Sequence, residues 1–325
     1  MSASPLTSAP VVRSPHVEQG VGTFSVRRIW VWWHLLSLDA PTVAVVWCWF
    51  FAAAFRVSLP PTALVTLALG TWCVYVADRL LDGWRSVDMA NLRDRHWFYL
   101  RHRKPFVIAW IAAATPLAYL ILFRVPPAVR IDDIVLCLIG IGYFLLIHHR
   151  SEGDRFSKEL FVGFLFSIAT AVPTWTRLQE GRGLLLAAIF TFGAACWLNC
   201  VAIQTWEDAE ARREGSQDRF ATSQAHELRD PKGNASRAGS ALRATLTAFL
   251  GNRLTAFAVV TGTMALAFTA FPAGRLVWPL FLAVAASSVM FLALIRRAGR
   301  MSALSLRVLA DGALLTPLLF LLHLR

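Results

Sequence analysis

The sequence is poor in charged residues, which make up 16% of the chain, whereas hydrophobic residues make up 56%. With a mean hydropathy of +0.53, this composition excludes an ordinary soluble domain and favours membrane spans. Cysteine is also scarce, and all five cysteines lie inside apolar runs, at positions 48, 73, 137, 196 and 200. We interpret them as small core residues rather than as disulfide partners or metal ligands.

The first 24 residues lack the short apolar core that a signal peptide requires. Because they are polar and rich in Pro and Ser, they are predicted to form a disordered cytoplasmic tail. Residues 25–325 are predicted to form a single membrane domain. We attribute the net charge of +12 to cytoplasmic loops and to contact with anionic headgroups, so the expected partners are membrane lipids and not nucleic acids.

Apolar runs predict an all-α integral membrane protein with about nine transmembrane helices. Most runs approach the ~20 residues that cross a ~30 Å hydrocarbon core. Residues 25–38 combine Arg with Trp and are predicted to form an interfacial helix, after which Asp39 caps the first span. The predicted spans are 41–57, 63–81, 106–123, 134–147, 160–175, 184–204, 254–271, 276–295 and 304–322.

Lys and Arg residues predict the orientation of these spans. Most of the 32 basic residues lie in the N-terminal segment and in the loops after the second, fourth, sixth and eighth spans. By the positive-inside rule, the N-terminus is then cytoplasmic and the C-terminus lies outside, with a long cytoplasmic loop at about 207–245. The expected location is a bacterial inner membrane.

The second span ends in an acidic motif, TWCVYVADRLLDGWRSVD, at residues 71–88. Asp78 and Asp82 are four residues apart, so a helix places both carboxylates on one face, where they repel each other. A divalent cation such as Mg²⁺, itself bound to a diphosphate, would compensate this repulsion. The alternative is a solvated helix end in which Arg79 and Arg85 form a local charge network with the two aspartates.

A second acidic cluster follows the sixth span in the sequence WLNCVAIQTWEDAEARREG. On a helix, Gln204 shares a face with Asp208, and Asn199 lies on nearly the same face as Glu207. If this helix end adjoins the first motif, Glu207 and Asp208 would hold metal ions together with the two aspartates. Arginines such as Arg212 would then bind diphosphate oxygens in bidentate fashion. The alternative is the first turn of a charged loop.

Nine spans with acidic motifs after the second and the sixth resemble the UbiA superfamily of intramembrane prenyltransferases. The loop after the fourth span resembles the family as well, because Tyr143 precedes a basic loop that leads to Lys158, Gly163 and Ser167. The resemblance covers roughly residues 39–322 and implies helices arranged around a central cavity. It further implies a Mg²⁺-dependent transfer of an isoprenyl group from an isoprenyl diphosphate to a lipophilic acceptor.

The resemblance also implies roles for individual residues. Asp78 and Asp82 would be catalytic and would bind Mg²⁺ together with Glu207 and Asp208. The implied diphosphate-binding residues are Arg79, Arg85, Arg95, Lys158 and Arg212, and the implied site is completed by Asn199, Gln204 and Tyr143.

Departures from the family pattern leave two other functions open. Val74 and Tyr75 stand where the family carries Asn and Asp, which favours a protein that has lost catalysis and binds a lipid. A small-molecule transporter would place charged residues deep in the membrane, and Asp311 in the ninth span is the main residue of this kind. The adjoining Gly312 equally allows close helix packing, in which Asp311 would hydrogen-bond to a neighbouring helix.

Overall fold

The computed structural model describes residues 32–85, 101–142 with gaps at 128, 133, 136–137 and 141, 155–227, and 235–323 with a gap at 273. Within these ranges, residues 82–85, 155–157, 213–227, 235–250 and 321–323 are described by their backbone alone. The described elements are all helical, and no strand occurs among them. The prediction of an all-α protein is therefore confirmed for the part of the chain that the structure covers.

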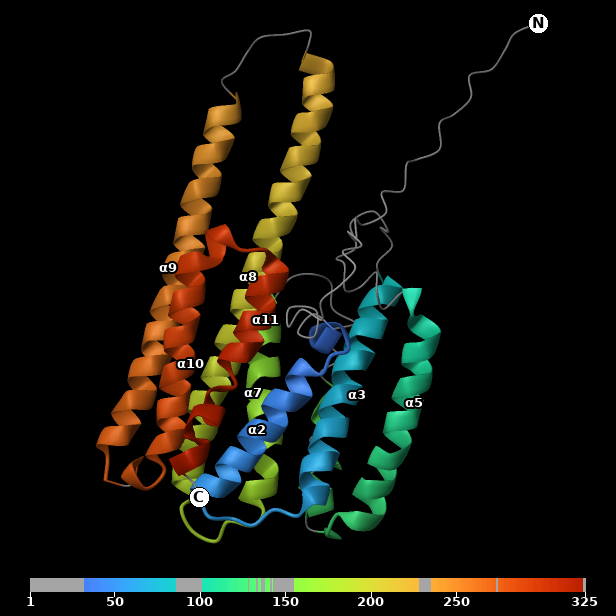
Figure 1. Cartoon of the computed structure of the whole chain (residues 1–325), viewed down its shortest axis with the longest axis vertical. Helices are drawn as coiled ribbons and strands as arrows, with labels where there is room; N and C mark the ends of the chain where they lie inside the picture. Colours follow the sequence, from blue (N-terminus) through green and yellow to red (C-terminus); the bar gives the residue numbers. More distant parts are fainter. Residues whose placement is uncertain are drawn as a thin grey trace, which may run out of the picture.

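The helices follow one another as an up-and-down bundle (Figure 1). A one-turn π-helix, η2 (Leu120–Arg124), extends the third helix, and a 3₁₀ segment, η5 (Thr316–His323), follows the last helix. The α-helices are α2 (Asp39–Ala54), α3 (Pro61–Arg85), α5 (Arg103–Tyr119), α7 (Arg155–Trp175), α8 (Arg182–Glu227), α9 (Ala235–Ala270), α10 (Trp278–Arg297) and α11 (Ala303–Ala313).

Among the residues that the structure describes, six helices are long and apolar enough to cross a membrane, which makes this an all-α membrane protein. They match the second, third, sixth, seventh, eighth and ninth predicted spans. The first predicted span corresponds to α2, a shorter apolar helix, and the fifth corresponds to α7. The fourth, predicted at 134–147, falls largely outside the described residues. The six are Pro61–Leu81, Arg103–Arg124, Arg182–Arg212, Gly251–Ala270, Trp278–Arg300 and Ala303–Phe320.

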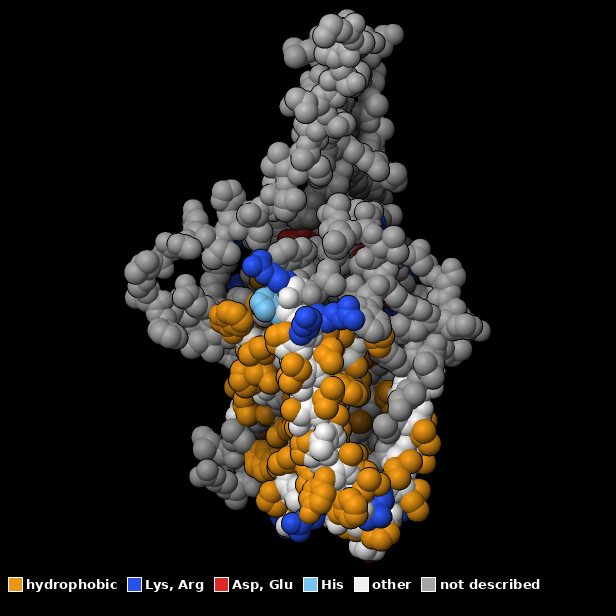
Figure 2. Space-filling view, turned by 90° about the vertical axis from the view of Figure 1, so that its right-hand side faces the viewer, with side chains coloured by type: hydrophobic (Ala, Val, Ile, Leu, Met, Phe, Trp, Pro, Cys, Tyr) orange, Lys and Arg blue, Asp and Glu red, His pale blue; other side chains and the backbone are white. Residues whose placement is uncertain are grey.

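The outer surface carries the apolar belt that a bilayer requires. Figure 2 shows hydrophobic side chains covering the face of the bundle between two levels at which Lys and Arg gather. Side chains such as Ile108 and Phe123 on the α5–η2 helix are exposed on this belt. Apolar groups facing outward between two basic levels are what a lipid-embedded helix presents to hydrocarbon and to headgroups.

Small residues bring α7 and α8 into close contact. A Cβ built on Gly163 of α7 would lie 2.6 Å from the backbone nitrogen of Trp197 on α8, so only glycine fits at this crossing. The Ser167 hydroxyl, one turn along α7, donates a hydrogen bond of 2.7 Å to the Ile189 carbonyl. Close backbone approach and a hydroxyl bond between helices are how membrane helices associate without a hydrophobic driving force.

An aromatic core fixes α2 against the C-terminal helices. Trp47 is fully buried, stacks on Phe192 of α8 with ring centroids 4.0 Å apart, and donates its indole N–H to the Leu314 carbonyl at 2.7 Å. Leu314 lies in the turn between α11 and η5, where the helix is interrupted. A carbonyl freed inside a membrane domain needs a donor from the protein, and Trp47 provides it.

The helix directions place the end of α3 and the acidic part of α8 towards the same end of the bundle. Helices α3 and α8 both begin at the end of the bundle where the C-terminus lies and finish at the opposite end (Figure 1). Helices α2 and α11 run the other way, so their first residues lie towards the end where α3 and α8 finish (Figure 1). Polar residues late in α3, at the end of the apolar part of α8 and early in α2 and α11 therefore lie towards one end of the bundle.

Candidate functional site

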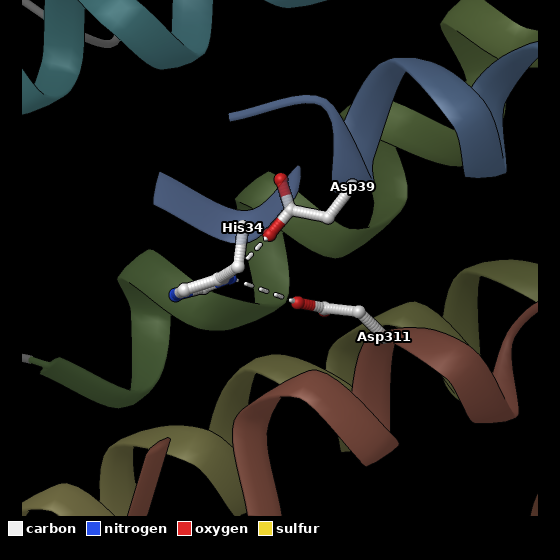
Figure 3. A group of neighbouring side chains, drawn as sticks. All are labelled: His34, Asp39 and Asp311. Atoms are coloured by element: carbon white, nitrogen blue, oxygen red, sulfur yellow. Dashed lines mark hydrogen bonds and ion pairs between the residues drawn. The ribbon is translucent and has the colours of Figure 1, made fainter. Parts of the chain in front are cut away.

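A buried ionic cluster lies where four helices and the segment before α2 meet. Its members are His34 from the segment before α2, Asp39 at the start of α2, Arg79 on α3, Asn199 on α8 and Asp311 on α11. Figure 3 shows His34 lying between the two carboxylates, with an interaction to each. His34, Arg79 and Asn199 are buried, and Asp39 and Asp311 are largely buried.

The backbone before α2 turns back to bring His34 to Asp39. Residues 32–35 form a short helical turn, and Ser37 then adopts a positive φ of 57°, which redirects the chain into α2. His34 Nδ1 lies 2.7 Å from Asp39 Oδ2, while Asp39 Oδ1 accepts the Ala40 N–H at 3.0 Å. A carboxylate in the first turn of a helix is also favoured by the helix dipole.

Arg79 joins α3 to this segment. Its side chain is only 4% exposed, Nη1 donates to the His34 carbonyl at 3.1 Å, and Nη2 lies 4.0 Å from Asp39 Oδ2. Tyr75, one turn earlier on α3, is close enough to Asp39 and Asp311 for their charges to act on its hydroxyl. The α3 face that carries Tyr75 and Arg79 therefore borders the cluster.

Asp311 completes the cluster from the opposite side. Asp311 Oδ1 accepts a hydrogen bond of 3.0 Å from the Asn199 side-chain amide, and Asp311 Oδ2 lies 3.9 Å from His34 Nδ1. The residue belongs to a helix that is apolar enough to cross a membrane, where a carboxylate is costly without compensation. A pocket adjoins the cluster and is lined by both carboxylates together with Trp33, Thr42 and Val308.

The charges of the cluster do not cancel on their own. Two carboxylates face one guanidinium, which leaves one negative charge when the imidazole is neutral. A proton held within the cluster or a bound cation would balance this charge. His34, Asp39 and Asp311 each offer a ligand atom, and these atoms all lie within 4.8 Å of one another.

The first predicted motif divides between the cluster and the end of α3. Arg79, predicted to bind diphosphate, faces the cluster, whereas Asp78 is half-buried and has no hydrogen bond or ion pair with any described residue. Asp82 and Arg85 lie in the last turns of α3, and their side chains fall outside the description. Arg95 and Tyr143 lie outside the described residues, and Lys158 is half-buried in the first turn of α7.

The second predicted motif lies on α8 and is tied to α11. Arg307 donates to Glu207 Oε1 at 2.6 Å, and Glu210 Oε1 accepts the Ala303 N–H at 3.1 Å, which satisfies a backbone donor at the start of α11. Gln204 donates to Asp208 Oδ1 at 3.0 Å, and Arg212 is exposed. Asn199, two turns before Glu207, instead faces Asp311.

His34 and Asp39 are the cluster members that were not predicted from the sequence, because residues 25–38 were predicted to lie on the membrane surface and Asp39 only to cap the first span. A histidine and an aspartate five residues apart at the start of an apolar run were the available signal. Asp311 stood out as an intramembrane acid, and its contact with Asn199 agrees with the interpretation of a hydrogen bond to a neighbouring helix. Comparison of the chain with known protein families, with curated proteins and with solved structures gives no match.

Proposed function

We propose that this protein is an integral membrane enzyme that transfers an isoprenyl group from an isoprenyl diphosphate to a lipophilic acceptor, with Mg²⁺ bound at the acidic motifs near the end of α3 and at the end of the apolar part of α8. In this proposal, nine spans enclose a central cavity in a UbiA-like arrangement in a bacterial inner membrane. The N-terminus is cytoplasmic, the C-terminus lies outside, and the diphosphate is bound at the cytoplasmic mouth.

One observation supports this proposal above the others. Helices α3 and α8 carry the two acidic motifs and run in the same direction (Figure 1), and each motif lies where the apolar part of its helix ends. Asp78 and Asp208 therefore lie towards one face of the membrane, where a diphosphate reaches them from water while an isoprenyl tail stays in hydrocarbon. A soluble headgroup and an apolar tail require a site of this amphipathic kind.

The donor set of the proposed site fits Mg²⁺. Asp78, Asp82, Glu207 and Asp208 offer carboxylate oxygens, the ligands that Mg²⁺ prefers, and Asp78 has no hydrogen bond with a described residue that would compete for its lone pairs. When bound, Mg²⁺ would neutralise negative charge on the departing diphosphate.

The remaining groups of the chain would orient these ligands and exclude water. Arg307 holds Glu207 through its 2.6 Å contact, and Gln204 holds Asp208 through its 3.0 Å hydrogen bond, so each carboxylate is fixed by one oxygen. Apolar helix faces would surround the isoprenyl group and keep water from the carbon that loses diphosphate. Arg212, exposed beyond the acidic motif, would contact outer diphosphate oxygens.

The test is Mg²⁺-dependent binding of a radiolabelled isoprenyl diphosphate to the purified full-length protein in detergent. The double variant Asp78→Asn/Asp82→Asn is expected to reduce this binding at least about tenfold, because it removes both charges of one motif. Asp132→Asn, an exposed aspartate beyond η2, is the matched control and should bind as the wild type does. Failure of the wild type to bind, or equal binding by the double variant, would contradict the proposal.

Product formation separates catalysis from binding. Membranes that contain the protein are incubated with donor and a lipid extract, and lipids are searched by mass spectrometry for a gain of an isoprene multiple. Binding of the donor without any such product would support the alternative of a UbiA-like lipid-binding protein that has lost catalysis.

A small-molecule transporter is the second candidate, and the cluster supports it. Asp311 is a carboxylate within a candidate span and meets Asp39 and His34 there, as acids on ion pathways do. Solute or proton flux into proteoliposomes that is abolished by Asp311→Asn but retained in Asp78→Asn/Asp82→Asn would favour transport over prenyl transfer.

A further inference from the structure

The ionic cluster has the ligand chemistry of a transition-metal site. We propose that His34, Asp39 and Asp311 bind a divalent transition-metal ion such as Zn²⁺, Mn²⁺ or Co²⁺ inside the membrane domain. This site is separate from the Mg²⁺ site of the proposed function and shares no metal ligand with it. The inference therefore does not depend on prenyl transfer.

Distances within the cluster are close to those of a coordination shell. His34 Nδ1 lies 2.7 Å from Asp39 Oδ2 and 3.9 Å from Asp311 Oδ2, and the three ligand atoms lie within 4.8 Å of one another. Ligands about 2.1 Å from one ion lie roughly 3–3.4 Å from each other. Small side-chain rotations, without movement of the helices, would bring the three atoms to this spacing.

The electrostatics of the cluster also favour a cation. Arg79 neutralises one of the two carboxylates, with Nη2 lying 4.0 Å from Asp39. The second carboxylate, Asp311, receives a neutral amide hydrogen bond from Asn199. An uncompensated carboxylate in this environment costs several kcal/mol by general estimates, so either a proton held by the carboxyl pair or a cation bound beside it must balance the charge.

Two buried polar side-chain atoms at the cluster lack hydrogen-bond partners among the described residues. Asn199 is 8% exposed, and its Oδ1 has no partner although its amide nitrogen is bonded to Asp311. His34 is 2% exposed, and its Nε2 has no partner within the described structure. Buried polar atoms are normally paired, so an Asn199 oxygen left beside Asp311 fits a further ligand or a metal-bound water.

The ligand set selects the type of metal. One imidazole with two carboxylates suits Zn²⁺, Mn²⁺, Fe²⁺ and Co²⁺, whereas Mg²⁺ and Ca²⁺ take oxygen ligands. Three protein ligands leave at least one coordination position open, and the pocket lined by Trp33 and Thr42 lies beside them. With Arg79 present, a divalent ion makes the site positive, so the open position would take an anionic ligand such as hydroxide.

Metal binding is tested on the purified full-length protein after removal of metals with a chelator. The probes are Zn²⁺ and Mn²⁺, counted per chain by mass spectrometry, and Co²⁺, followed by its visible absorption. The wild type is expected to retain one ion per chain after gel filtration and to show a Co²⁺ spectrum typical of mixed nitrogen and oxygen ligands. Less than about a tenth of an ion per chain for all three probes would overturn the proposal.

Variants locate the site. His34→Gln and Asp311→Asn are each expected to weaken Co²⁺ binding at least about 100-fold, while His102→Gln at the start of α5 should leave it unchanged. Gel filtration and thermal unfolding show whether each variant is folded. If Asp311→Asn does not fold, Asp39→Glu, which keeps the charge, is used in its place. Unchanged Co²⁺ binding in folded His34→Gln would overturn the proposal.

Variants of the Mg²⁺ motif test whether the transition-metal site and the Mg²⁺ site are separate. Asp78→Asn/Asp82→Asn is expected to bind Co²⁺ as tightly as the wild type does, even where it loses the isoprenyl diphosphate. Loss of Co²⁺ in this variant would contradict a separate site, whereas loss of the donor alone bears only on the proposed function.

Discussion

At the scale of single residues, Arg79 decides whether the cluster is stable. Its guanidinium is 4% exposed and contacts both the His34 carbonyl and the Asp39 carboxylate, so it connects α3 to the segment before α2. A buried ion pair contributes little net stability when it is intact, because desolvation offsets the attraction. Removal of one partner lowers stability strongly, because the remaining charge stays buried and loses its compensation.

Arg79→Ala is therefore expected to destabilise the protein by about 3–5 kcal/mol, the range found when one partner of a buried ion pair is removed. The measurement is unfolding by a denaturing detergent in mixed micelles, followed by circular dichroism. Arg300→Ala, at an exposed arginine between α10 and α11, is the control and should stay within about 0.5 kcal/mol of the wild type. Equal stability of the two variants would mean that Arg79 does not hold the cluster together.

A residue of the site could be predicted only where the local sequence around it carried a signal. Asp311 stands out in an apolar run, and the four-residue spacing of Asp78 and Asp82 identifies a shared helix face. The meeting of His34 with Asp311 depends on a backbone turn at Ser37 and on packing between α2 and α11. Periodicity gives the face on which a side chain lies but not the helix that it faces, so this contact could not be derived from the sequence.

At the scale of helices, the contact between α7 and α8 depends on one missing side chain. Gly163→Ala would place a methyl group 2.6 Å from the Trp197 nitrogen and 2.8 Å from its Cα, and backbone cannot yield as a flexible side chain does. We expect this variant to lose about 1–3 kcal/mol in the same unfolding assay, as overpacked cores do. Gly183→Ala, where the added carbon meets nothing within 4 Å, should change stability by no more than about 1 kcal/mol.

A stable Gly163→Ala variant would show that α7 and α8 cross less closely than the structure has them. Because Asn199 lies on α8, close packing of α7 against α8 also helps to position one wall of the cluster. Separation of these helices is thus expected to weaken Co²⁺ binding as well as stability.

Helix existence was predicted better than helix extent. Apolar runs of near-membrane length gave the six candidate spans, because length and hydropathy are local properties. Residues 207–245 were predicted as a loop, yet α8 continues to Glu227 and α9 begins at Ala235. Hydropathy indicates where a helix leaves the membrane. It does not indicate whether the polar sequence that follows continues the same helix.

At the scale of the whole molecule, the distribution of charge connects the fold to the proposed function. An apolar belt separates two levels of Lys and Arg, and both acidic motifs lie towards one end of the bundle (Figures 1 and 2). The ionic cluster is formed by the late part of α3 and the first part of α2 and so lies nearer that end. Orientation in the membrane therefore decides which compartment supplies the diphosphate and the metal.

The proposed orientation predicts which loops are reached from outside the cell. Ser58, exposed between α2 and α3, is expected on the outer side, and Arg300, exposed between α10 and α11, on the cytoplasmic side. In intact cells, a membrane-impermeant maleimide should label Ser58→Cys and leave Arg300→Cys unlabelled until the cells are permeabilised. The unsubstituted protein gives the background from its own cysteines, most of which are buried. The reverse pattern would put both acidic motifs outside the cell, where no cytoplasmic isoprenyl diphosphate could reach them.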